Sequence, residues 1–345
     1  MTSIKMKTIK TQMLLRTIYV VFALVSSITF AQNTNLEYNN LIRDGWKLCL
    51  EKNFIESAKL YEKAFKLNNK VPLSDRYNAS CIYALSGNKD MAFHYLFITA
   101  NDLKWDDYNH LINDSDLKVL HSDKRWEELK AVVLKNKQEV EAHFDKDLVA
   151  VLDKIYFDDQ STRNQIRSME EKYGRNSKEM DAFWQTILKK DSINLIKVSK
   201  ILDERGWPSK ALIGKRGTST LFLVIQHANQ EAQEKYLPLI EKAVADNNLP
   251  KQQYAMFYDR LLLRRGERQV YGTQLAINNE SKTPYVLPLE DPINVDTRRL
   301  EMGLNTMQEN LNRWSLTWDA EAYLKERPAI EAKEKELNSK NNKND

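Results

Sequence analysis

Apolar residues recur at helical spacing along much of this 345-residue chain, and this pattern restricts its fold more than any other feature. Leu148, Leu152 and Ile155 lie three or four positions apart, and Phe257 and Leu261 repeat the spacing. Residues with this period share one face of an α-helix. We therefore predict a mainly α protein, and the chain is long enough for two domains.

The first 31 residues have the pattern of a signal peptide. Four basic residues and no acid precede the apolar stretch 17–30, which is short for a bilayer span and contains several Ser and Thr residues. Ala31 is a small residue at the expected cleavage position. We expect an exported protein, periplasmic or secreted, with no stable membrane span after cleavage. An uncleaved anchor helix is the alternative, and Met6 and Met13 are alternative start sites.

The charge balance argues against nucleic acid as a partner. The chain has 52 Lys and Arg residues against 48 Asp and Glu residues, and its predicted signal peptide holds four of the basic ones. Cleavage therefore leaves 48 residues of each sign. A chain without net charge lacks the positive field that attracts a phosphate backbone.

The two cysteines, Cys49 and Cys81, are too few for a disulfide scaffold. Both fall in predicted helices, where buried thiols are the simplest interpretation and a disulfide between neighbouring helices is the alternative. His94, His110 and His121 lie in the same region without metal-ligand spacing. We expect no metal and no cofactor.

Residues 36–135 combine large and small residues at fixed offsets, in a pattern that resembles two tetratricopeptide repeats. The first copy contains Leu41, Gly45, Leu48, Phe54, Ser57, Tyr61 and Ala64. The second copy, 35 residues later, contains Ser80, Tyr83, Ala92, Leu96 and Thr99. Such arrays bind a protein or peptide partner in a concave groove, although two repeats serve equally well as a scaffold.

The segment after the second repeat resembles the cap that often closes such arrays. Asp116 is the predicted N-cap, and its side chain would bind the first free amides of a helix. Leu117, Leu120, Trp126 and Leu129 would then cover the open end of the stack.

A charged connector near residues 135–146 leads into a second domain, which we place at 145–320. Its helices are predicted from three features: the spacing that begins at Leu148, the break at Gly206-Trp207-Pro208, and a capping segment near Thr218. Asp191 and Asn194 are expected just before a helix. A last helical stripe contains Leu300, Leu304, Met307, Leu311 and Trp314. Residues 325–345 are predicted to form a frayed helix or a disordered tail.

One β-hairpin is expected inside this helical domain. Residues 269–277 and 284–290 flank a polar loop and have the composition of strands. Strict alternation puts Gln269 and Gln274 on opposite faces, unless Gly272 introduces a bulge.

Polar residues concentrate beside the apolar segments of the second domain, and they are the candidate lining of a ligand-binding pocket. They are Asp159, Gln160, Arg163, Gln226, His227, Asp259, Arg260, Gln269, Tyr271, Thr273, Gln274, Arg298 and Arg299. Guanidinium groups bind carboxylate, sulfate or phosphate through paired hydrogen bonds. The alternative is an internal network in which Asp259 pairs with an arginine and joins two helices.

Several of these segments together resemble domain-of-unknown-function family 6624. The segments are Asp159-Gln160 with Arg163, Gly206-Trp207-Pro208, Gln226-His227-Ala228, Asp259-Arg260, Gln269 to Gln274, and Arg298-Arg299 to Gly303. Their consistent order over about residues 145–315 is more specific than any one motif. The resemblance implies domain limits and no established activity.

Common catalytic motifs are missing from the sequence. It lacks a nucleotide-binding glycine loop, since residues 214–218 have the wrong spacing for a phosphate loop. It also lacks a nucleophile elbow. A zinc site in the second domain would have His227 as its one histidine. A hydrolase or transferase in which Asp259 or Asp191 orients His227 as general base is the alternative hypothesis.

Three hypotheses follow from these residues. The preferred one is an exported binding or interaction protein, with a partner on the repeats and a small polar or anionic ligand in the second domain. The second is an enzyme centred on His227. The third is a scaffold whose polar residues satisfy one another.

Overall fold

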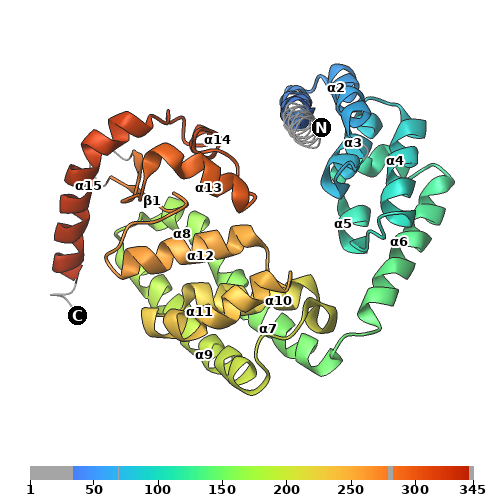
Figure 1. Cartoon of the computed structure of the whole chain (residues 1–345). Helices are drawn as coiled ribbons and strands as arrows, with labels where there is room; N and C mark the ends of the chain where they lie inside the picture. Colours follow the sequence, from blue (N-terminus) through green and yellow to red (C-terminus); the bar gives the residue numbers. More distant parts are fainter. Residues whose placement is uncertain (1–33, 69, 279–282, 342–345) are drawn as a thin grey trace, which may run out of the picture. The chain divides into compact units, whose positions relative to one another are not determined.

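The structure is a computed structural model that describes residues 34–68, 70–278 and 283–341 (Figure 1). The predicted signal peptide, residues 1–31, lies outside the described residues. The chain divides between Ala142 and His143 into two compact units. Among the described residues, no helix has both the length and the apolar character to cross a bilayer.

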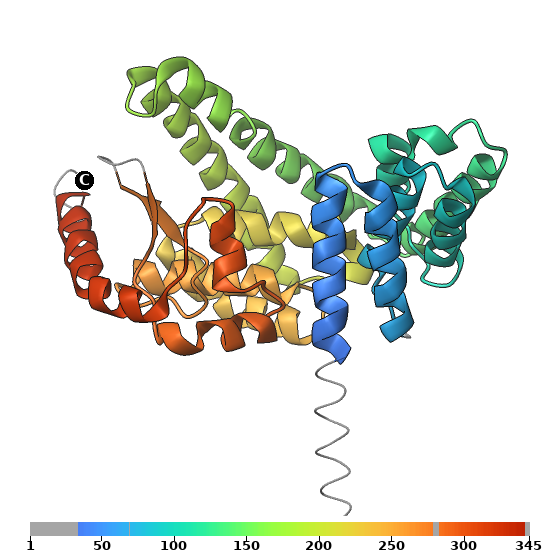
Figure 2. The same cartoon turned by 90° about the horizontal axis from the view of Figure 1, so that it is seen from above.

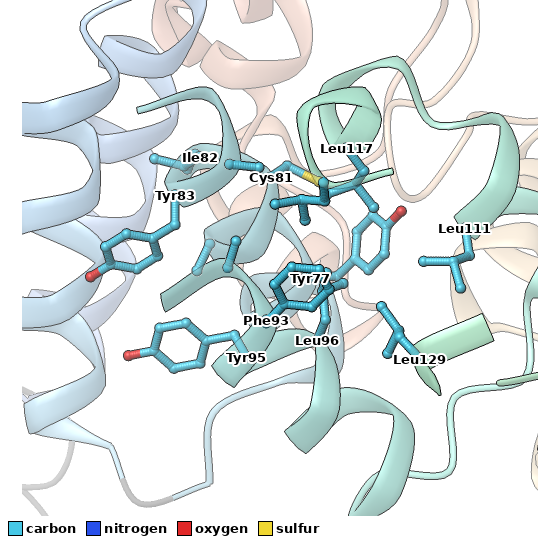
Figure 3. Close-up of a cluster of buried hydrophobic side chains, with 14 of the residues drawn as sticks. Tyr77, Cys81, Ile82, Tyr83, Phe93, Tyr95, Leu96, Leu111, Leu117 and Leu129 are labelled. Atoms are coloured by element: carbon cyan, nitrogen blue, oxygen red, sulfur yellow. The ribbon is translucent and has the colours of Figure 1, made fainter. Parts of the chain in front are cut away.

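The N-terminal unit consists of consecutive helices. Residues 34–50 are helical. The elements that follow are α2 (Phe54–Leu67), α3 (Leu73–Leu85), α4 (Lys89–Asn101), α5 (Tyr108–Asn113), the 3-10 helix η1 (Ser115–Leu120) and α6 (Arg125–Glu141). Their apolar faces form one core, in which Ile82, Phe93 and Leu96 are almost completely buried (Figure 3). This core stabilises the unit because it removes large apolar side chains from water.

Small residues allow the first two helices to approach closely. The Ser57 hydroxyl donates a 2.7 Å hydrogen bond to the carbonyl oxygen of Gly45 on the preceding helix. A Cβ atom on Gly45 would lie 2.8 Å from the Tyr61 ring, which is too close for any larger residue. The small residues Gly45 and Ser57 and the large residue Tyr61 therefore pack together where these two helices meet.

The cap of this unit differs from the prediction at its first residue. Asp114 caps η1, because its carboxylate accepts a 2.9 Å hydrogen bond from the amide of Asp116. Asp116 was predicted as the N-cap and instead lies in the first turn. The four apolar residues expected to cover the stack are all buried: Leu117, Leu120, Trp126 and Leu129.

The C-terminal unit holds the remaining described helices and the only described sheet. Its elements are α7 (Lys146–Arg163), α8 (Ile166–Tyr173), α9 (Lys178–Arg205), α10 (Lys210–His227), α11 (Gln230–Ala245), α12 (Lys251–Arg264), β1 (Leu275–Ile277), β2 (Pro284–Val286), η2 (Pro292–Asn294), α13 (Val295–Glu301), α14 (Met307–Asn312) and α15 (Ala320–Asn341). The main core lies between α7, α9, α10, α11 and α12.

Two helices in this core are longer than predicted. The helix expected to begin near Thr218 starts at Lys210 and breaks at Gly214, where φ is 67°. Phe144 packs against that break, 2.8 Å from the position of a Cβ atom. Asp191 and Asn194, expected before a helix, lie in the middle of α9.

The hairpin and the last predicted helix are shorter than expected. β1 and β2 pair antiparallel over three residues each, and an isolated bridge joins Gln269 to Leu289. The stripe predicted from Leu300 to Trp314 is split between α13 and α14, since Gly303 has a φ of 69°. Leu300 is consequently 62% exposed. The prediction of a mainly α fold with a small β-hairpin is confirmed.

Helix α15 includes residues 325–341 of the segment for which we expected a frayed helix or disorder. It lies beside the hairpin in both views (Figures 1 and 2). The Tyr285 hydroxyl donates a 2.6 Å hydrogen bond to Glu334, and Tyr323 is buried in a small separate core. These contacts hold the helix against the rest of the unit.

Candidate functional site

The Asp259 carboxylate organises the loop before β1. It accepts hydrogen bonds from the amides of Val270, Tyr271 and Thr273 at 2.7 to 2.9 Å, and a fourth from the Thr273 hydroxyl at 2.9 Å. Asp259 is fully buried, and this burial raises its pKa although the four donors oppose the rise. Because all four donors belong to one loop, the carboxylate fixes the shape of that loop.

Arg298 and Arg299 hold the same loop from α13. The Arg298 guanidinium donates to the carbonyl oxygens of Val270 at 3.0 Å and Glu290 at 2.7 Å. Arg299, which is 1% exposed, donates to the carbonyl oxygens of Tyr271 and Asn305 at 2.7 and 2.6 Å.

Burial lowers the pKa of Arg299. The predicted direct pairing of Asp259 with one of these arginines is wrong for the described residues. Asp259 binds the loop amides, while the arginines bind carbonyl oxygens of the same loop.

The two glutamines close the loop. Gln269 is fully buried, and its amide group both donates to the Gln274 carbonyl and accepts from the Gln274 main-chain amide. The Gln274 side chain donates to the Thr273 hydroxyl at 3.0 Å. Gly272 allows the turn with a φ of 65°, while Met307 packs over it. We name the loop 269–274, together with Asp259, Arg298 and Arg299, the loop network.

A second polar group joins α7, α9 and α10. His227 Nδ1 lies 3.0 Å from Asp159 Oδ1, and the Arg163 guanidinium donates to the same oxygen at 2.9 Å. Arg163 also donates to both oxygens of Asp191, at 2.9 and 2.7 Å. Gln160 donates to the second oxygen of Asp159. We name these five residues the histidine cluster.

The histidine cluster is partly accessible and strongly charged. Asp159 is buried, whereas the side chains of His227 and Arg163 are each 17% exposed. Burial acts to raise the pKa of Asp159, but the hydrogen bond and charge of His227 and the charge of Arg163 outweigh it and lower that pKa. The carboxylate therefore stays ionised and holds the imidazole in one orientation.

Three members of this cluster offer possible metal ligands. Ligand atoms of Asp159, Asp191 and His227 lie within 4.8 Å of one another. The Arg163 guanidinium already binds both carboxylates and supplies a positive charge between them. A divalent cation would have to displace it, so these residues fit an ion-pair network better than a metal.

Arg260 lies near the histidine cluster without a carboxylate of its own. One nitrogen donates a long 3.3 Å hydrogen bond to the Gln226 carbonyl. Burial and the charges of Arg264 and Arg163 lower the pKa of Arg260. Among the residues that the structure describes, no acid lies within ion-pair distance of Arg260, and the buried Oε1 atoms of Gln226 and Gln233 accept no hydrogen bond.

Arg260 lines a large cleft of the unit. This cleft has a volume of about 1370 Å³ and lies between α12, the hairpin segments and α15. Tyr258, Val270, Gln274, Glu290 and Glu331 line the same cleft. Two of the thirteen candidate pocket residues, Arg260 and Gln274, therefore line this cleft.

The structure places eleven of the thirteen candidates in two sets, and the other two, Arg260 and Gln226, contact each other through the Gln226 carbonyl. Asp159, Gln160, Arg163 and His227 meet in the histidine cluster, whereas Asp259, Gln269, Tyr271, Thr273, Gln274, Arg298 and Arg299 belong to the loop network. Arg264 was missed, although it follows Arg260 by one helical turn and therefore lies on the same face of α12. It donates to the Ala228 carbonyl.

The C-terminal unit is thus a mainly α domain with a buried loop network and a separate charged cluster. The chain belongs to a family of unknown function, DUF6624, whose sequence model matches residues 145–321. No curated protein and no solved structure matches the chain.

Proposed function

We propose that the protein is an exported binding protein whose C-terminal unit binds a small anion at Arg260. The observation that carries this proposal is the largely buried guanidinium of Arg260, which has no carboxylate partner among the described residues. A buried charge without a partner is costly, and proteins compensate it with an opposite charge. A bound anion would provide that charge.

The surroundings of Arg260 support a small ligand with at least two oxygen atoms. Its guanidinium has donors to spare, because only one hydrogen bond from it is found within the described chain. Arg264 adds a second positive charge and lines the same cleft. Carboxylate, sulfate and phosphate all match the paired donors of a guanidinium group.

Titration of the full chain with sulfate, phosphate and a small dicarboxylate at constant ionic strength tests this proposal. We expect the Arg260→Gln variant to bind at least about 10-fold more weakly, since a hydrogen bond to a charged group contributes about 1.5–3 kcal/mol. Arg265→Gln is the matched control. Arg265 lines the same cleft but already pairs with Glu234 at 3.0 Å, so its loss should leave affinity unchanged. Equal affinity of the Arg260→Gln and parent proteins for every anion would refute the proposal.

A hydrolase or transferase centred on His227 is the second candidate, and the Asp159–His227 contact favours it. A carboxylate that holds Nδ1–H leaves Nε2 as a proton acceptor, the arrangement of a general base. Asp159 has the orienting position that the sequence analysis gave to Asp259 or Asp191. Turnover of phosphate or carboxylic esters by the parent protein, absent in His227→Asn and retained in His121→Asn, would support this candidate. A broad ester screen without turnover would count against it.

Export and partner binding complete the proposal. Support for export comes from the basic, apolar and small-residue segments of residues 1–31. N-terminal sequencing of the protein secreted by a bacterial host is expected to begin at Gln32, and retention of residues 1–31 would contradict export by cleavage. We further infer a tetratricopeptide-like array over residues 36–135, supported by the close contact between Gly45 and Ser57.

A further inference from the structure

Three metal-binding side chains from two segments converge in the N-terminal unit. Cys81 comes from α3, and Asp114 and Asp116 come from the start of η1. Their ligand atoms all lie within 4.8 Å of one another. We propose that Cys81, Asp114 and Asp116 bind a divalent zinc-type cation beside His110. This site is independent of the anion site in the C-terminal unit.

The distances within this group match those between ligands of one metal ion. Cys81 Sγ lies 3.6 Å from Asp114 Oδ2. Bonds of about 2.3 Å to sulfur and about 2.0 Å to oxygen at a tetrahedral angle separate the two atoms by about 3.5 Å. His110 Nε2 lies 3.7 Å from the same oxygen, at the edge of this group of three.

The surrounding residues hold Asp114 in the required orientation. Its Oδ1 atom accepts a hydrogen bond from the Asp116 amide, and its Oδ2 atom accepts a 2.8 Å hydrogen bond from the Tyr77 hydroxyl. Hydrogen bonds of this kind fix ligand carboxylates in metal sites. Figure 3 shows Cys81, Tyr77 and Leu117 of η1 in the same core, where their backbones are held by packing.

The electrostatics of the group also favour a cation. Two carboxylates and one thiol converge here with their ligand atoms within 4.8 Å of one another. A divalent cation would stabilise both carboxylates and the thiolate, while the thiol proton leaves to solvent. A thiolate ligand selects zinc over calcium or magnesium, which prefer oxygen ligands.

The group is open on one side. Cys81 is 7% exposed, the Asp114 side chain is 12% exposed and the His110 side chain is 54% exposed. Exposure therefore increases from Cys81 through Asp114 to His110.

Cobalt substitution in the reduced full chain tests the thiolate bond directly. Because the chain has two cysteines, the Cys49→Ser variant leaves Cys81 as its only thiol. We expect cobalt(II) to give this variant a thiolate-to-metal charge-transfer band that zinc abolishes, and Cys49→Ser/Cys81→Ser to give none. A parent-like circular dichroism spectrum without the band in Cys49→Ser would overturn the proposal.

Zinc affinity separates the ligands from their neighbours. Asp116→Asn should weaken zinc binding by more than about 100-fold, and Tyr77→Phe, which removes only the orienting hydroxyl, by about 10-fold. His94→Ala is the control, since His94 is an exposed histidine of α4 outside the group. Unchanged affinity in Asp116→Asn, or an equal loss in His94→Ala, would show that the metal binds elsewhere.

Discussion

The loop network and the surroundings of Arg260 contain similar residues but differ in how completely those residues satisfy one another. In the loop network, the oxygens of Asp259 receive four hydrogen bonds and Arg299 donates to main-chain carbonyls. Beside the histidine cluster, Arg260 has one long hydrogen bond and no acidic partner among the described residues. Functional capacity is therefore better judged from unused donors and acceptors than from residue type.

Asp259→Ala should have the largest effect on stability. The change leaves three loop amides and a hydroxyl without acceptors, so we expect a loss of about 4 kcal/mol in the free energy of unfolding. Urea denaturation measures the loss, and hydrogen exchange at Val270 and Tyr271 reports it locally. Asp181→Ala, at an exposed position of α9, is the control and should change stability by less than about 1 kcal/mol. Similar losses in both variants would mean that Asp259 does not organise the loop.

Arg299→Met should lower the free energy of unfolding by about 3 kcal/mol. Methionine fills part of the same buried space but leaves the carbonyls of Tyr271 and Asn305 without donors. The same urea experiment measures the effect. A stability equal to that of the parent would contradict the structural role that distinguishes this arginine from Arg260.

Asp159→Asn should change the dependence of stability on acid. The folded-state pKa of Asp159 is lowered, so its carboxylate stabilises the fold above the ordinary aspartate pKa of about 3.9. That contribution is lost as the pH falls through the lower folded-state value. Unfolding curves between neutral pH and about pH 3 should therefore show a smaller acid-induced loss in Asp159→Asn than in the parent. Parallel curves for the two proteins would contradict this assignment.

Arg260→Met should have the smallest effect on stability without added anion, and we expect a change within about 1 kcal/mol or a slight gain. The substitution removes a largely buried charge that has no acidic partner among the described residues. Thermal unfolding with and without sulfate measures the effect. Sulfate should raise the Tm of the parent more than that of the variant. A loss as large as that of Arg299→Met would place Arg260 in a structural network.

Local sequence patterns predicted the helices well and their ends less well. The spacing of Leu148, Leu152 and Ile155 was sufficient to predict helix α7, because these residues form the buried face of that helix. The stripe from Leu300 to Trp314 was misleading, since apolar spacing continues across the break at Gly303.

Contacts between distant segments explain why the candidate site was less predictable. Asp159 and Arg163 are one helical turn apart, so their grouping follows from sequence. Asp159 and His227 are 68 positions apart, and only the packing of α7 against α10 brings them together. Asp259 and Arg260 are adjacent in the chain, but their side chains leave α12 in different directions. Asp259 binds the loop amides, whereas Arg260 binds the Gln226 carbonyl.

The contacts that Asp259 and Arg299 make with the loop also imply an order of folding. Asp259 binds amides only 11 to 14 positions later, whereas Arg299 binds a carbonyl 28 positions earlier. The shorter closure costs less chain entropy and can form while the segment after the hairpin is still unfolded. We therefore infer that Asp259 shapes the loop early and that α13 locks it late. We expect the Arg299→Met variant to have a φ-value near zero in refolding kinetics, and a value near one would contradict this order.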